Sequence, residues 1–274
     1  MMRWLLTLLV ALSTAFLVSC SSGGRTTGAP PSEVETEVNL DVRGHQYYML
    51  GQYDSASAIL QRMLKLDPEN KIALKDLGSM HFQLAMMDTD KKSPARLQHL
   101  RTSRQYYAKL EGLGEHELEL YDRLCETSLA LGDDNGFLTY AKMSVDQYPF
   151  DRQYFNLGLA YYDLGDYESA IKIEKEAIAR FENSSYMSSF YRQLGRAYMK
   201  VDRDQTAERT LEQGLQIVNQ RLLENTSPEE IRRLMDDKIG ILVSLKHIYK
   251  TYHKDDKLKE AERELLEAGY KAQE

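Results

Sequence analysis

The feature that most constrains this sequence is a short pattern that occurs more than once. Residues 154–161 read YFNLGLAY and residues 191–198 read YRQLGRAY, so a tyrosine, a Leu-Gly pair and an Ala-Tyr pair recur at the same spacing. Weaker copies include Leu77-Gly78 and the segment 44–70. Self-similarity with a period of about 20–50 residues is the signature of repeat proteins, in which each unit packs only against its neighbours. The chain is therefore predicted to be a repeat protein.

These residues resemble the tetratricopeptide repeat (TPR), a pair of antiparallel helices about 34 residues long. In such a unit, small residues such as Gly158 and Ala170 let the two helices approach each other. Larger side chains such as Tyr154 and Leu157 fill the space between the helices. The resemblance implies an all-α fold for residues 37–274, a right-handed superhelical TPR solenoid of about six helix-pair repeats.

Six units follow from placing the pattern along the chain. The second is irregular, because residues 86–94 indicate an inserted loop before a long second helix that ends near Leu110. Before the sixth unit a helix start is predicted, with Ser227 as the cap, Pro228 at the first helical position and Glu230 reaching back to the cap. The sixth unit departs from the pattern, as a terminal capping repeat does. The units are placed at residues 37–70, 71–110, 118–151, 151–184, 188–221 and 242–271.

The N-terminus has the features of a secretory signal peptide, which we assign to residues 1–19. Arg3 supplies a positive charge, and the apolar run 4–18 is shorter than the roughly 20 residues of a membrane-spanning helix. Leu17-Val18-Ser19-Cys20 then resembles the bacterial lipobox, which implies cleavage before Cys20 and its modification with palmitate or a similar acyl chain. The chain is thus similar to bacterial TPR lipoproteins. A plain signal peptide, or a short anchor helix that happens to end in cysteine, is the alternative.

Residues 20–36 are predicted to be the lipidated cysteine and a flexible tether, because they are rich in Gly, Ser, Thr and Pro and lack apolar periodicity. Each buried methylene contributes about 0.8 kcal/mol, so a multiply acylated Cys20 would hold the protein at a membrane surface. In similar lipoproteins an aspartate after the cysteine favours the inner membrane. Here Ser21 takes that position, which implies a place in the cell envelope at the periplasmic face of the outer membrane.

Charge and cysteine content limit the partners and the chemistry. The net charge of −7 argues against nucleic acid as a partner. Cys20 and Cys125 are the only cysteines, so acylation of the first would leave the second without a disulfide partner.

No set of catalytic or metal-binding residues is recognisable, and the protein is predicted not to be an enzyme and to hold no cofactor or metal. The sequence has no His-Glu-x-x-His motif, no phosphate-binding glycine loop and no Gly-x-Ser-x-Gly elbow. His81 takes a tyrosine-like position in the second unit, and Cys125 takes the small-residue position of Gly158. Residues 133–136 resemble a calcium loop but lack the later glutamate, and are predicted to form a turn.

In the TPR family the first helix of each unit lines the concave face of the superhelix. The resemblance places acidic residues there in unit three, aromatic residues in unit four and basic residues in units five and six. Such a groove suits an extended or helical peptide, because rings supply contact area and charges set orientation. The alternative is a solvated helix face, with Phe155 and Tyr162 buried between repeats. The predicted groove residues are Glu119, Asp122, Glu126, Arg152, Phe155, Asn156, Tyr162, Arg192, Arg196, Lys200, Lys246 and Lys250.

The sequence therefore favours a membrane-anchored adaptor, or scaffold, that binds other envelope proteins through peptide segments in this groove and serves the assembly of an envelope complex. The pathway, whether pilus, outer-membrane or cell-wall assembly, is left open by the residues. The alternative function is a periplasmic binding module for a small ligand or a cell-wall fragment.

Overall fold

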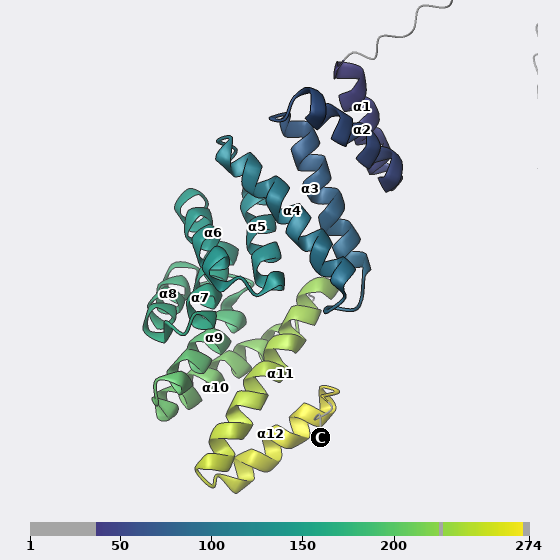
Figure 1. The fold of residues 1–274 in the computed structure, drawn as a ribbon. Helices are drawn as coiled ribbons and strands as arrows, with labels where there is room; N and C mark the ends of the chain where they lie inside the picture. Colours follow the sequence, from purple (N-terminus) through teal and green to yellow (C-terminus); the bar gives the residue numbers. More distant parts are fainter. Residues whose placement is uncertain (1–36, 225–226, 271–274) are drawn as a thin grey trace, which may run out of the picture. The chain divides into compact units, whose positions relative to one another are not determined.

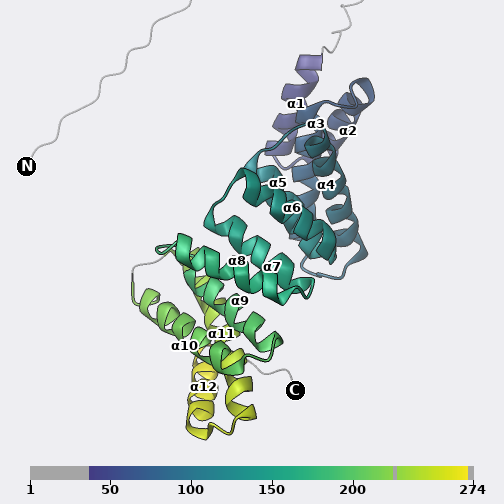
Figure 2. The ribbon, with the colours of Figure 1, turned by 90° about the vertical axis from the view of Figure 1, so that its left-hand side faces the viewer.

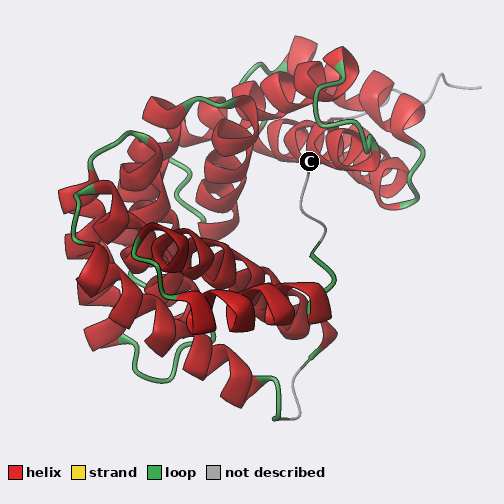
Figure 3. Ribbon diagram, turned by 90° about the horizontal axis from the view of Figure 1, so that it is seen from below, coloured by secondary structure: helices red, strands yellow, loops and turns green. Residues whose placement is uncertain are grey.

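The computed structural model describes residues 37–224 and 227–270, and in these ranges the chain is entirely helical (Figures 1 and 3). The predicted signal peptide, Cys20 and the tether lie outside the described residues. No helix in the described ranges is long and apolar enough to cross a membrane. The helices are α1 (Glu37–Met49), α2 (Tyr53–Leu66), α3 (Lys71–Met87), α4 (Pro94–Gly112), α5 (Leu118–Leu131), α6 (Asp134–Gln147), α7 (Asp151–Asp163), α8 (Tyr167–Arg180), α9 (Met187–Lys200), α10 (Asp204–Arg221), α11 (Pro228–Thr251) and α12 (Asp255–Glu267).

The twelve described helices form six consecutive pairs, from α1–α2 to α11–α12. Each helix packs against the one before it and the one after it along the chain (Figures 1 and 2). First helices of successive pairs also touch, α1 with α3, α7 with α9 and α9 with α11. Contacts limited to neighbouring pairs are those of a solenoid. The predicted all-α solenoid of helix pairs is confirmed.

The irregular second pair is joined by a longer connection, between the end of α3 at Met87 and the start of α4 at Pro94. The Arg96 guanidinium holds this connection by donating hydrogen bonds to the carbonyl oxygens of Ala85 at 2.7 Å and Asp88 at 2.6 Å. The loop thus closes onto the first turn of α4, which begins with Ser93 as cap and proline at its start.

The turn predicted at residues 133–136 is shorter in the structure, because α6 already begins at Asp134. Gly132 ends α5 with a φ of 67°, a left-handed conformation that glycine adopts without strain. Asp133 is already the cap of α6, and its carboxylate accepts a hydrogen bond from the backbone N–H of Gly136 at 3.0 Å. Asp134 to Gly136 therefore form the first turn of a helix.

The helix start at Ser227 and Pro228 is present, and it opens the first helix of the last pair. Ser227 Oγ accepts a hydrogen bond from the Glu230 backbone N–H at 3.2 Å, while the Glu230 carboxylate pairs with Arg221 at 3.4 Å. From there α11 runs without a break to Thr251. This helix therefore begins well before residue 242, where the sixth unit was expected.

The small-residue position in the first helix of a pair lies against a large side chain of the second helix. A Cβ added at Gly195 in α9 would lie 2.5 Å from Cγ of Leu211 in α10, which is fully buried. One at Gly78 in α3 would lie 3.0 Å from the ring of Tyr107 in α4. These two pairs are thus closed over a site that has no room for an added methyl group.

Replacing Gly195 by alanine is expected to destabilise the protein by about 1–3 kcal/mol, because a buried leucine would have to move. Urea unfolding followed by circular dichroism measures the change. Gly112→Ala is the matched control, since a Cβ at Gly112, in the last turn of α4, meets nothing within 4 Å. Equal unfolding midpoints for the two variants would contradict this account of the pair.

Candidate partner-binding groove

Arg152, near the start of α7, connects two adjacent repeats by ion pairs. Its guanidinium lies 3.2 Å from the Asp122 carboxylate and 3.0 Å from that of Glu126, both on α5. Arg123 pairs with Glu126 from the same helix at 2.8 Å, and Gln153 donates to Asp122 at 3.1 Å. Two of the acidic residues predicted for unit three, Asp122 and Glu126, are therefore already joined to a cation of unit four. The third, Glu119, lies 3.7 Å from Lys75 of unit two.

Asp122 is the most buried charged member of this network, with 15% of its side chain exposed. Burial raises the pKa of its carboxyl, and the nearby Arg152 charge opposes that shift. Its interactions with Arg152 and Gln153 thus replace only part of the hydration that the carboxylate lost on burial. A further hydrogen-bond donor or cation from a partner would find a favourable place beside it.

Two hollows adjoin this network, and both are lined by Glu126 and Arg152. The first, of about 380 Å³, is lined mostly by charged residues and lies over α5. The second, of about 220 Å³, combines aromatic walls with an amide. In the second hollow the rings of Phe155 and Tyr186 lie 5.4 Å apart between their centroids. The other residues that line the two hollows are Leu118, Glu119, Asp122, Arg123, Cys125, Leu129, Phe137 and Asn156.

The two aromatic residues predicted for unit four are half-buried. Phe155 packs partly against the apolar core around Tyr154 while it lines the second hollow. Tyr162 lies under the Arg196 guanidinium, whose carbon is 4.4 Å from the ring centroid, and it packs edge-on against Tyr167. Arg196 and Tyr162 thus join the first helices of units four and five.

The basic residues predicted for units five and six are not gathered into one surface. Arg192 pairs at 3.1 Å with Asp237, whose side chain is 1% exposed. The Arg192 charge is therefore neutralised between the packed repeats. Lys246 pairs at 3.0 Å with Glu262 of α12. Lys200 and Lys250 are exposed. The geometry therefore concentrates the candidate groove at α5 and α7.

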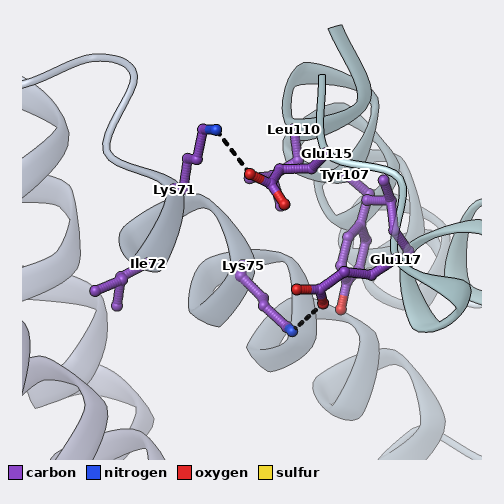
Figure 4. A pocket seen from close by; sticks show the side chains of 8 residues that line it. Lys71, Ile72, Lys75, Tyr107, Leu110, Glu115 and Glu117 are labelled. Carbon is purple, nitrogen blue, oxygen red and sulfur yellow. Dashed lines mark hydrogen bonds and ion pairs between the residues drawn. The ribbon is translucent and has the colours of Figure 1, made fainter. Parts of the chain in front are cut away.

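A separate pocket, which the sequence did not indicate, lies where α3, α4 and the start of α5 meet (Figure 4). Two ion pairs join its sides, Lys71 with Glu115 at 2.7 Å and Lys75 with Glu117 at 2.6 Å. The partners are 44 and 42 residues apart along the chain. The only local sign was that Lys71 and Lys75 are one helical turn apart and share a face of α3.

Cys125 and His81, which the sequence analysis considered for possible chemistry, are both at least partly buried. Cys125 is buried, and burial raises the pKa of its thiol to about 12, so it stays protonated at neutral pH. His81 Nδ1 lies 2.9 Å from His99 Nδ1, and burial lowers the pKa of His81 to about 4. In the described part of the chain, no group of three or more His, Cys, Asp or Glu side chains is arranged to hold a metal ion.

Models of the tetratricopeptide repeat match this sequence at residues 42–85 and at residues 152–183. In these two segments the chain matches the tetratricopeptide repeat. The second of these segments includes Arg152, Phe155 and Asn156 of the second hollow, while Phe137 and Tyr186 of that hollow lie outside it.

Solved TPR structures share the fold. The MamA protein superposes with a TM-score of 0.57 and 18% identity, over 70% of this chain and 97% of that one. YrrB, described as a TPR protein with an unusual peptide-binding site, superposes with a TM-score of 0.56 and 14% identity, over 68% of this chain and 88% of that one. The CTR9 homolog of Arabidopsis thaliana is 29% identical over 161 residues, which are 56% of this chain. The match spans only 14% of that plant protein's length.

The TPR core of units four and five holds one ionisable group without a partner. Glu174 of α8 is fully buried, and neither carboxyl oxygen has a hydrogen-bond partner among the described residues. It lies against Gly158 of α7, where an added Cβ would collide with it, and near Gln193 of α9. Burial raises the pKa of Glu174 well above its ordinary value of 4.5, opposed by the Arg192 charge.

Because the folded state holds Glu174 in its neutral form, its raised pKa makes stability fall as pH rises from 4.5 toward the folded-state pKa. We expect Glu174→Gln, which is neutral at every pH, to be more stable than the wild type at pH 8, with Tm higher by about 2–4 °C per kcal/mol gained. Calorimetric Tm values between about pH 5 and 8 test this linkage. The exposed Glu182→Gln is the control, and parallel curves for wild type and Glu174→Gln would refute the expectation.

Proposed function

We propose that this protein is a membrane-anchored TPR adaptor that binds protein partners in the bacterial cell envelope. Its scaffold is the helix-pair solenoid, and its binding surface is the pair of hollows around Arg152. Cys20 is its lipid anchor, residues 20–36 are its tether, and the periplasmic face of the outer membrane is its location. Its partners are envelope proteins rather than nucleic acid, and its role is the assembly of an envelope complex.

The observation that carries this proposal is the form of the two hollows. The second hollow has aromatic walls beside charged groups, and the first adds further charged groups next to it, as in protein-binding surfaces. The half-exposed Phe155 can receive an apolar side chain, and Asn156 can pair with a peptide backbone through its amide. A structure of the same fold, YrrB, has a peptide-binding site by its own description, which supports peptide recognition here.

No catalytic role is proposed, because the hollows contain no activated nucleophile beside a base. The thiol that lines the second hollow, Cys125, is protonated and buried. Its neighbours Glu126 and Arg152 are engaged with each other. Such a site binds by complementarity.

Replacing Arg152 by glutamate is expected to weaken partner binding at least tenfold, because the reversal removes both ion pairs and places like charges together. A photo-reactive amino acid at Asn156 would measure binding as crosslinks formed in envelopes, in the wild type and in Arg152→Glu. Lys175→Glu, on the exposed face of α8, is the matched charge-reversal control. No crosslinked protein from Asn156, or equal yields in both variants, would rule out this groove as the binding surface.

The lipid anchor has its own test. Cells that express the wild type should incorporate an alkyne analogue of palmitate into this protein, and cells that express Cys20→Ala should not. In-gel detection after coupling to a fluorophore measures the label. Cys125→Ala is the control, since its buried thiol should make no difference to labelling. Label that survives Cys20→Ala would remove the anchor from the proposal.

A further inference from the structure

The pocket between α3, α4 and α5 is distinct from the Arg152 hollows and has its own chemistry (Figure 4). Its volume is about 260 Å³, below the range of about 300–1,000 Å³ that suits drug-sized ligands. The walls are apolar. Tyr107, Leu110 and Leu120 are almost fully buried, while Ile72 is 48% exposed. The space therefore fits one small molecule with an apolar body.

The charges of this pocket are sorted by sign. Figure 4 shows the two ammonium groups, Lys71 and Lys75, extending from α3 toward the carboxylates of Glu115 and Glu117 on the opposite side. All four side chains are between 32% and 57% exposed, so the two ion pairs are in contact with water. Ion pairs of this kind contribute little to folding. A ligand can replace them without weakening the fold.

Because the lysines and the glutamates lie on opposite sides, only certain combinations of charged groups on a ligand fit this pocket. A ligand with only a carboxylate would take Lys75 and leave Glu117 beside a like charge. A ligand with only an ammonium group would separate Lys75 from Glu117 and leave it only the more distant Glu119, at 3.7 Å. A molecule that carries both groups side by side replaces each half of an ion pair with a group of the same charge. The hydrogen bond to Glu117 raises the pKa of Lys75, and the hydrogen bond from Lys71 lowers the pKa of Glu115, so both interactions favour the charged forms.

We propose that this pocket binds a free apolar α-amino acid, such as phenylalanine or leucine. The α-carboxylate lies on the lysine side, the α-ammonium group on the glutamate side, and the side chain against Tyr107, Leu110 and Leu120. The carboxylate and the ammonium group of an α-amino acid are attached to one carbon, so they can reach opposite sides of the mouth while the side chain points inward. This binding activity does not depend on the adaptor function, and neither test bears on the other.

The test compares ligands that differ by one group, using the purified full chain in detergent with matched detergent in the ligand solution. Isothermal titration with L-phenylalanine and L-leucine should show saturable binding. N-acetyl-L-phenylalanine lacks the ammonium charge, L-phenylalaninamide lacks the carboxylate, and L-alanine lacks the apolar body. Each of these three should bind at least tenfold more weakly than L-phenylalanine.

Two variants locate the binding. Lys75→Met should weaken L-phenylalanine binding at least tenfold, while Lys246→Met, which breaks an ion pair of similar exposure on α11, should leave it unchanged. Circular dichroism verifies that both variants are folded. No binding of either amino acid at 10 mM would overturn the proposal, and so would full binding to Lys75→Met. Full binding of the acetylated compound would instead indicate a peptide C-terminus, and full binding of the amide a peptide N-terminus. Either result would overturn the free amino acid as ligand.

Discussion

The structure depends on the close approach of the two helices within each pair. At Gly195 the chain omits a side chain so that Leu211 of the next helix can pack against the backbone. At Gly158 the same position accommodates the Glu174 side chain, and in unit three Cys125 fills it with a small buried group. Because each pair packs only on its neighbours, errors at these positions would change how every following pair is placed.

Charged side chains form a second layer of contacts between repeats. Arg152 connects α7 to α5, and Arg192 connects α9 to the buried Asp237 of α11. These pairs have different consequences. Asp237 also accepts hydrogen bonds from Ser188 and Ser189, so its pair with Arg192 belongs to the core. The Arg152 pairs are half-exposed, and they border the hollows that can receive a partner.

The sequence predicted the local features well because their causes are local. Ser227 caps α11 because a serine followed by proline suits the first turn of any helix. The small-residue position of Cys125 was predicted from its place in the repeat, and the thiol is buried. The first helix of the last pair was misplaced because the repeat pattern is weak there. No proline lies between Pro228 and residue 242, and Gly240, which packs against Arg192, is accommodated inside the helix, so α11 is one long helix.

By itself the sequence determined an all-α chain of paired helices, because the spacing of tyrosine, glycine and alanine fixes which helix faces can meet. It also placed Glu126 and Arg152 among the groove residues of units three to six. Only the tertiary structure decided which charges are paired and which hollows are open. Helical periodicity assigns a residue to a face, but the partner across from that face is set by the stacking of repeats. Lys75 and Glu117, 42 residues apart, meet for that reason alone.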